Sequence, residues 1–114
     1  MRRPENIKEM NWCFLQSSGI TLIEPNTNLA FGHILKAEVS LNEMQNTKSR
    51  TWKIITAYYT MYESVYAILM KYGIKCEIHN CTIAFVRFFL SNHFSSGEID
   101  LLEDSCTARG NVQY

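Results

Sequence analysis

The chain has 114 residues, of which 46% are apolar and 12% aromatic, and its 11 basic side chains balance 11 acidic ones. This length suits a single domain, and the apolar content is sufficient for a packed core. A net charge of zero argues against a protein that binds nucleic acid through phosphate contacts alone, because such binding neutralises many phosphates. Weak charge repulsion also favours self-association.

The N-terminal sequence has two arginines followed by polar and acidic residues, where a secretory signal peptide would be apolar. The longest apolar run, VYAILM (residues 65–70), is far too short to span a bilayer. We therefore expect a cytoplasmic protein that does not contact a membrane.

The four cysteines are even in number, which is compatible with two disulfides, but the expected compartment favours reduced and mostly buried thiols. They are Cys13, Cys76, Cys81 and Cys106. Cys76, Cys81 and the nearby His79 do not complete a tetrahedral metal site, so we expect neither a metal nor a cofactor.

Residues 1–25 are predicted to form a helical segment and a linker that pack on the main domain. Pro4 suits a first helical turn, and Gly19 is a candidate left-handed stop for this helix. The stretch ITLI (residues 20–23) could be extended, but no partner strand is evident, so it is interpreted as an apolar linker.

Residues 26–114 show the pattern of a four-helix domain. An asparagine or threonine among residues 26–28 can cap a helix whose apolar positions follow steps of three and four. These positions are Ala30, Ile34, Ala37, Leu41 and Met44. A second helix is predicted over residues 50–72, apolar on nearly every side, so neighbouring elements should surround it. Gly73 should end this helix in the left-handed conformation.

The third helix is predicted from near Asn80 to Ser91, and Ser95 with Glu98 forms a capping-box signature for the last helix. The last helix should turn four residues inward: Ile99, Leu102, Cys106 and Ala108. No β-hairpin pair is evident. The fold is therefore predicted to be all-α, an up-down-up-down four-helix bundle with an extra N-terminal helical or irregular segment.

Three stretches carry a likeness to a known family. They are AYYTMYESVYAILMKYGIKCEIH (residues 57–79), IAFVRFFL (residues 83–90) and ARGNVQY (residues 108–114). Together with the helix order, they resemble the HEPN domain family, and most closely its small prokaryotic branch with a YYAMF-like central helix. The resemblance covers about residues 28–114. It implies a bundle that often dimerises, in a family that includes RNases paired with a small nucleotidyltransferase antitoxin.

The RNase motif of that family is an arginine followed a few residues later by a histidine. Arg109 takes the arginine position, but Tyr114 stands where the histidine would be, and a tyrosine with its ordinary pKa near 10 is a poor general base at neutral pH. The resemblance therefore implies a non-catalytic module that binds a nucleotide or RNA-like anion, with arginine holding the phosphate. The candidate binding residues are Tyr59, Tyr62, His79, Arg109 and Tyr114. The expected protein partners are a second copy and a nucleotidyltransferase.

Two interpretations compete for the tyrosines and for the histidine. Rings at helical spacing can be core residues with hydroxyls at the edge, or Tyr59 and Tyr62 can line a cleft and stack a base. His79 can bond a backbone group at a helix start, or it can face a ligand.

The charged residues also leave alternatives open. Glu63 stands alone in an apolar stretch, and it either faces solvent or pairs with a cation such as Arg109 or Arg87. Arg109 can hold a phosphate, or it can form an ion pair with Asp104 or Glu103.

Two further functions remain as alternatives. A metal-independent RNase would need His79 or His93 to replace the missing histidine across a dimer interface. The spacing of Arg87 and His93 imitates the RNase motif, but this pair straddles the end of the third helix, so it is set aside. A purely structural dimer or antitoxin-like partner without a ligand is the other possibility.

Overall fold

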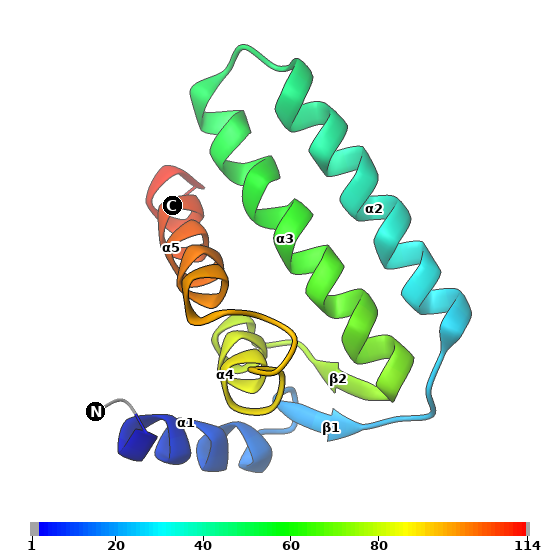
Figure 1. The fold of residues 1–114 in the computed structure, drawn as a ribbon, viewed down its shortest axis with the longest axis vertical. Helices are drawn as coiled ribbons and strands as arrows, with labels where there is room; N and C mark the ends of the chain where they lie inside the picture. The colour runs from blue at the N-terminus through cyan, green and yellow to red at the C-terminus, as the bar shows by residue number, and fades with distance from the viewer. Residues whose placement is uncertain (1–2, 114) are drawn as a thin grey trace.

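The computed structural model describes residues 3–113, with the side chains of residue 8 and of residues 10–112. Within them lie five helices and two short strands (Figure 1). In chain order these are α1 (Arg3–Leu15), β1 (Ile20–Leu22), α2 (Thr27–Asn46), α3 (Arg50–Tyr72), β2 (Ile74–Cys76), α4 (His79–Phe89) and α5 (Ser96–Gln113). The all-α prediction is confirmed.

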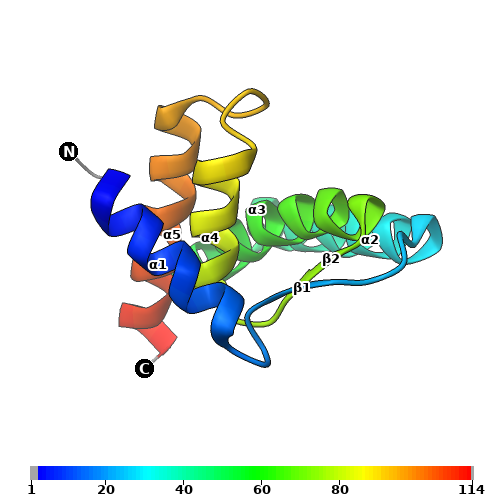
Figure 2. The ribbon, with the colours of Figure 1, turned by 90° about the horizontal axis from the view of Figure 1, so that it is seen from below.

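Two antiparallel helix pairs form the body of the fold. α2 and α3 lie side by side in the plane of Figure 1, whereas α4 is seen nearly end-on and therefore runs across them. α4 and α5 lie side by side and run in opposite directions in Figure 2. The C-terminal part of α5 returns to α3, and this contact positions the candidate site.

Side chains cap the start of both long helices. The Asn26 side chain accepts a hydrogen bond from the Leu29 N–H at 2.9 Å, and the Ser49 hydroxyl accepts one from the Trp52 N–H at 3.1 Å. Each cap pairs a backbone donor that the first helical turn leaves unbonded. The predicted cap of α2 is confirmed.

α3 is the central helix. No residue from 54 to 70 is exposed, as the nearly continuous apolar sequence predicts, whereas both ends reach solvent. Gly73 ends the helix with a φ of 79°, and its N–H bonds the carbonyls of Leu69 and Met70. The predicted boundary and its left-handed stop are confirmed.

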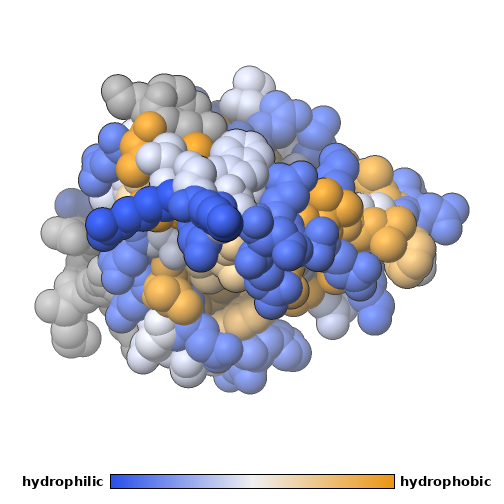
Figure 3. Space-filling view, turned by 90° about the horizontal axis from the view of Figure 1, so that it is seen from above, coloured by the Kyte–Doolittle hydropathy of each residue, from blue (hydrophilic) through white to orange (hydrophobic). Residues whose placement is uncertain are grey.

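α2 packs one narrow face on α3 and leaves much of its apolar surface uncovered. Ala30 and Ala37 are buried as predicted, but Ile34 and Leu41 of the same row remain 39% and 38% exposed. A second row of α2, Phe31, Leu35 and Val39, is more exposed still. Apolar side chains stand among hydrophilic ones on the α2 side of the face seen in Figure 3.

The two strands pair with each other, which corrects the prediction of an apolar linker and a plain connector. β1 and β2 are antiparallel, with Ile20 opposite Cys76 and Leu22 opposite Ile74. The Ile23 N–H also bonds the Gly73 carbonyl at 2.8 Å. These pairs join segments fifty or more residues apart, so neither segment carries a local sequence signal for its partner.

Gly19 does not act as the predicted left-handed stop, because Gly73 is the only glycine with positive φ among residues 3–113. α1 ends earlier, at Leu15. At Gly19 a Cβ atom would lie 1.9 Å from the Cys13 carbonyl oxygen, so this position requires glycine for close backbone approach.

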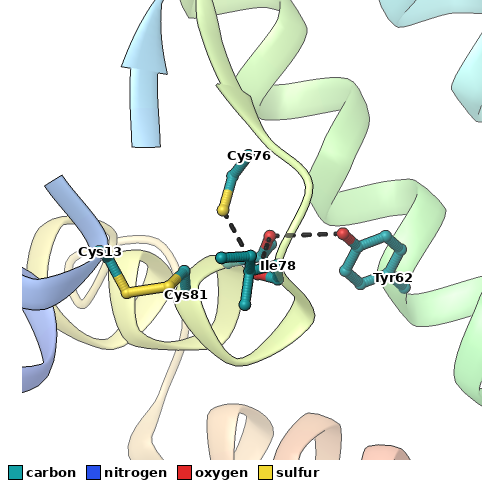
Figure 4. The surroundings of a disulfide bond; sticks show 6 residues. Cys13, Tyr62, Cys76, Ile78 and Cys81 are labelled. Carbon is teal, nitrogen blue, oxygen red and sulfur yellow. Dashed lines mark hydrogen bonds between the residues drawn. A yellow bond between two sulfur atoms is a disulfide. The ribbon is translucent and has the colours of Figure 1, made fainter. Parts of the chain in front are cut away.

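A disulfide joins Cys13 of α1 to Cys81 of α4, which corrects the prediction of four reduced thiols (Figure 4). Cys76 and Cys106 are thiols, and Cys76 is buried near the disulfide with its Sγ donating to the Ile78 carbonyl. α1 packs on α4 and on β1, and the bridge attaches it covalently to α4.

α5 begins with the predicted capping box. The Ser95 N–H donates to a Glu98 carboxylate oxygen at 2.8 Å, and the Glu98 N–H donates to the Ser95 hydroxyl at 3.1 Å. Ile99 and Leu102 are buried and Cys106 is half-buried, so the predicted inward face is confirmed for these residues. Across residues 3–113, no helix combines the length and the apolarity needed to cross a bilayer.

Candidate functional site

A ladder of aromatic rings runs along the inner face of α3. Tyr58, Tyr62 and Tyr66 follow one another at four-residue steps, with ring centroids 5.6 Å and 5.7 Å apart and planes tilted by less than 30°. Because residues four apart share a helix face, the sequence of α3 alone produces this stack. Tyr58 is completely buried and Tyr62 is 7% exposed, so both rings belong to the core.

His79, the first residue of α4, lies against this ladder. Its ring is stacked 4.2 Å from Tyr62 and 5.6 Å from Tyr58, and its Nδ1 lies 2.6 Å from the Tyr58 hydroxyl. The prediction that His79 bonds a backbone group is therefore replaced by a bond to a side chain. A histidine at this place joins α4 to the centre of α3.

The pKa directions of these groups agree with one protonation pattern. Burial raises the pKa of both the Tyr58 and the Tyr62 phenols, so each keeps its proton. Burial, followed by the positive charge of Arg109, lowers the pKa of His79 despite an opposing effect of Glu63. The hydrogen bond between the Tyr58 hydroxyl and His79 Nδ1 therefore joins a neutral phenol to a neutral imidazole.

Arg109 reaches the edge of the same cluster from α5. Its guanidinium carbon lies 4.9 Å from the Tyr58 ring centroid and 5.9 Å from that of Tyr59, and Nη1 lies 3.5 Å from the Tyr59 hydroxyl. Ile99, Leu102, Cys106 and Arg109 follow helical steps of three and four, which turns the arginine toward α3. Contacts of this kind between a cation and a ring contribute about 0.5–2 kcal/mol.

The structure thus brings together four of the five sequence-predicted residues. Tyr59, His79 and Arg109 are half-buried, and the enclosed ring of Tyr62 supports His79 from behind. Tyr114, the fifth, lies outside the described residues. The buried Tyr58, which is not among the five, contacts both Arg109 and His79.

Glu63 pairs with His33 of α2, so of the two expected environments it has the paired one, but its partner is neither Arg109 nor Arg87. The His33 Nδ1 meets the Glu63 Oε2, and the side chains are 14% and 18% exposed. The His33 ring also stands edge-on to Tyr66, with centroids 4.8 Å apart. Arg87 instead binds Asp100 at 3.0 Å and Glu103 at 2.9 Å.

Sequence reasoning missed His33. The signal that could have found it was the single carboxylate of Glu63 in an apolar stretch, which needs a polar partner on the helix packed against α3. His33 is the histidine of that helix.

A groove of about 360 Å³ follows the seam between α2 and α3 on the solvent side of Tyr59. Its walls are Leu35, Lys36, Val39 and Ser40 from α2, and Tyr59 and Glu63 from α3. Tyr59 therefore contacts Arg109 through its hydroxyl and also lines the groove.

Two other hollows lie away from this cluster. One of about 310 Å³ lies between α3, α4 and α5 and includes Thr60, Ser64 and Phe94. Another of about 400 Å³ is nearly all apolar and is formed by the two strands with α1, α3 and α4. Among residues 3–113, no three histidine, cysteine or acidic side chains gather closely enough to hold a metal ion.

No model of a known protein family matches the chain, and neither the curated proteins nor the solved structures contain a significant match to it. The geometry described above is therefore the basis for assigning a function.

Proposed function

We propose that this chain is a non-catalytic, HEPN-type binding module that holds a nucleotide or RNA-like anion at the Arg109 cluster, meaning Arg109, Tyr59, Tyr58 and His79. The observation that carries this proposal is the half-buried guanidinium, which lies over the Tyr58 ring and reaches the Tyr59 hydroxyl. Arginine binds phosphate through paired N–H donors, and an adjacent ring can stack a base. Both chemistries meet at this point of the surface.

The residues have distinct roles in this proposal. Arg109 binds the phosphate and Tyr59 offers a ring to the base, whereas Tyr62 acts indirectly by supporting His79. His79 and Tyr58 hold each other through their hydrogen bond and so fix the floor beneath the guanidinium. Tyr114 remains a predicted fifth contact.

Calorimetric titration with adenosine, guanosine, cytidine and uridine monophosphates and a short single-stranded RNA tests this function, at about 50 and 150 mM salt. We expect affinity that falls with salt and drops about tenfold in Arg109→Ala, because a charge-assisted phosphate contact contributes at least 1.4 kcal/mol. Lys71→Ala, an exposed change at the far end of α3, is the matched control and should bind as the wild type. Absence of binding at millimolar ligand would reject the proposal.

The same proposal includes a homodimer, supported by the apolar surface around the 400 Å³ hollow. Leu22, Phe14 and Phe89 line this hollow and are 85%, 52% and 52% exposed, which is unusual for large apolar side chains that cluster. A second copy would cover this surface without contacting Arg109. Sedimentation analysis should give a dimer that Phe89→Glu dissociates and that Leu101→Glu, on exposed α5 surface, does not.

A metal-independent RNase is the second candidate, supported by the presence of His79 in the same cluster as Arg109. The lowered pKa of His79 keeps the imidazole neutral near pH 7, the form in which it can accept a proton. Incubation of RNA with wild type, Arg109→Ala and His79→Gln distinguishes the candidates. Cleavage that both substitutions abolish supports an RNase, and equal background cleavage by all three proteins rejects it.

A nucleotidyltransferase partner and a cytoplasmic location complete the proposal. The nucleotidyltransferase partner is proposed because residues 57–79 resemble the HEPN family. Purification of the tagged chain from its host tests this proposal, which predicts that a nucleotidyltransferase is recovered with it. The Cys13–Cys81 disulfide weighs against the location, because disulfides persist mainly in oxidising compartments. Alkylation of thiols in freshly lysed host cells followed by mass analysis decides whether the bridge exists in the cell.

A further inference from the structure

The groove along the α2–α3 seam adjoins the Arg109 cluster through Tyr59, so a ligand held by Arg109 can extend into it. Its volume of about 360 Å³ falls within the range of small-molecule sites, which is about 300–1,000 Å³. Such sites combine apolar walls with a few placed polar groups. Here Leu35 and Val39 supply the apolar wall, and Ser40, Lys36 and Glu63 supply the polar groups.

Glu63 is the best positioned of these polar groups. Its Oε2 is bound by His33, and the His33 ring itself packs against Tyr66, so these contacts restrict the position of the carboxylate. Within the described residues its other oxygen, Oε1, makes no hydrogen bond. Because Glu63 also lines the groove, the groove contains a carboxylate that needs little further ordering when a ligand binds.

A carboxylate acceptor in the lining of a groove selects ligands that carry a hydrogen-bond donor. On the apolar side the groove offers Leu35 and Val39, and on the α3 side it offers Tyr59, an arrangement that suits a flat ring system. A nucleobase with an exocyclic amino group has both the flat ring and the donor. Lys36, at the same groove, adds positive charge that favours the phosphate of such a ligand.

We infer that the seam groove is the base pocket of the nucleotide site, and that Glu63 selects a base with an exocyclic amino group, such as adenine. This inference rests on the proposed function, because it takes the phosphate to be held at Arg109. The base would lie between Tyr59 and the aliphatic wall of α2, with its amino group donating to Glu63 Oε1. His33 acts as a positioning residue for the carboxylate and does not contact the ligand.

Two ligands that differ only in the amino group test the inference on the unmodified protein. Adenosine monophosphate should bind about tenfold more tightly than purine riboside monophosphate, which has a hydrogen in place of the amino group. The difference corresponds to one hydrogen bond to a charged acceptor, which the second ligand leaves unmade. Because this comparison needs no variant, a folding defect cannot obscure it.

Variants then assign the selection to the groove. Glu63→Ala, which removes the acceptor, should lower the affinity for adenosine monophosphate and leave that for purine riboside monophosphate nearly unchanged, so that the ratio falls toward one. Tyr59→Ala should weaken both ligands alike, since the ring stacks either base, and Lys71→Ala should change neither.

The outcomes separate this inference from the function on which it rests. Equal affinity for the two ligands in the wild type, or a ratio that survives Glu63→Ala, overturns the base pocket while the Arg109 site stands. If neither ligand binds at millimolar concentration, the proposed function fails and the base pocket fails with it.

Discussion

His79 uses one ring nitrogen and one ring face to hold the interior of the cluster together. Its Nδ1 shares a hydrogen bond with the buried Tyr58 hydroxyl, and its ring lies on that of Tyr62. Protonation would place a positive charge in a partly buried site close to Arg109. The neutral form is therefore part of the folded structure, and the stability of the fold must depend on pH.

We expect the free energy of unfolding to fall as the solution is acidified below about pH 6.5, the ordinary pKa of histidine. In the folded state the pKa of His79 is lowered, so the unfolded chain binds the proton first and stability is lost as pH falls through the folded pKa. Above pH 6.5 this contribution is fully present. Urea unfolding of wild type and His79→Gln between pH 5 and 8 measures it. Equal slopes for the two proteins would contradict the role of His79.

The candidate residues could be predicted only as far as their own helices determined their direction. The spacing of Ile99, Leu102, Cys106 and Arg109 turns the arginine inward, and the tyrosine steps of α3 predict the ring stack. The partner of Glu63 could not be predicted, because it depends on how α2 is rotated against α3. That rotation is set by packing across the two helices, which one helical pattern does not contain.

At the level of elements, the helix boundaries follow local chemistry. Gly73 illustrates this, because its φ of 79° is a conformation that side chains rarely adopt and a Cβ there would lie 2.4 Å from the Ile23 carbonyl oxygen. That carbonyl belongs to the segment that follows β1, so this segment passes directly against the turn after α3. Gly73 thus ends α3 and, because it has no side chain, leaves room for the segment after β1.

We expect Gly73→Ala to reduce the free energy of unfolding by about 1–3 kcal/mol, through backbone strain and the clash with Ile23. Gly32→Ala is the matched control. It lies inside α2 with nothing within 4 Å of the added methyl group, so it should stabilise the protein by about 0.5–1 kcal/mol. Urea unfolding at neutral pH measures both. A stabilising Gly73→Ala would show that the left-handed turn is not required.

The elements that sequence reasoning missed are those formed by distant segments. Asn26, Gly73 and the Ser95–Glu98 box act within a few residues, and the sequence predicts each of them correctly. β1 and β2 are three residues long and are separated by two long helices, so their pairing leaves only short apolar stretches in the sequence. Short apolar stretches do not distinguish a strand from a linker.

For the whole molecule, the Cys13–Cys81 disulfide is a covalent bond between parts of the chain that are far apart in sequence. It joins residues separated by 68 positions, and both sulfurs are buried in the main core. Cysteine spacing alone does not determine such a pairing, since four cysteines allow three complete pairings and several partial ones. The close approach of α1 to α4 decides it, and this approach is a property of the folded chain.

We expect reduction of this bridge to lower the free energy of unfolding by about 2–4 kcal/mol, because the open chain regains conformational entropy when it unfolds. The protein is first incubated in urea with or without dithiothreitol, so that the buried bridge is accessible to the reductant. Urea unfolding curves of the two samples then measure the effect. The Cys13→Ala/Cys81→Ala double variant should match the reduced wild type and should not respond to the reductant. An equal response of the double variant would assign the effect to another cause.

The bridge also divides the molecule into two mechanical parts. The stretch from Cys13 to Cys81 is a covalently closed loop that contains Tyr58, Tyr59 and His79, whereas Arg109 sits on the open tail beyond it. α5 is thus retained by non-covalent contacts, among them the Arg87 ion pairs with Asp100 and Glu103, and it can separate from α3 and α4 while the closed loop stays intact. A ligand that touches both Tyr59 and Arg109 would fasten the tail to the loop, so occupancy and the docking of the last helix would rise and fall together.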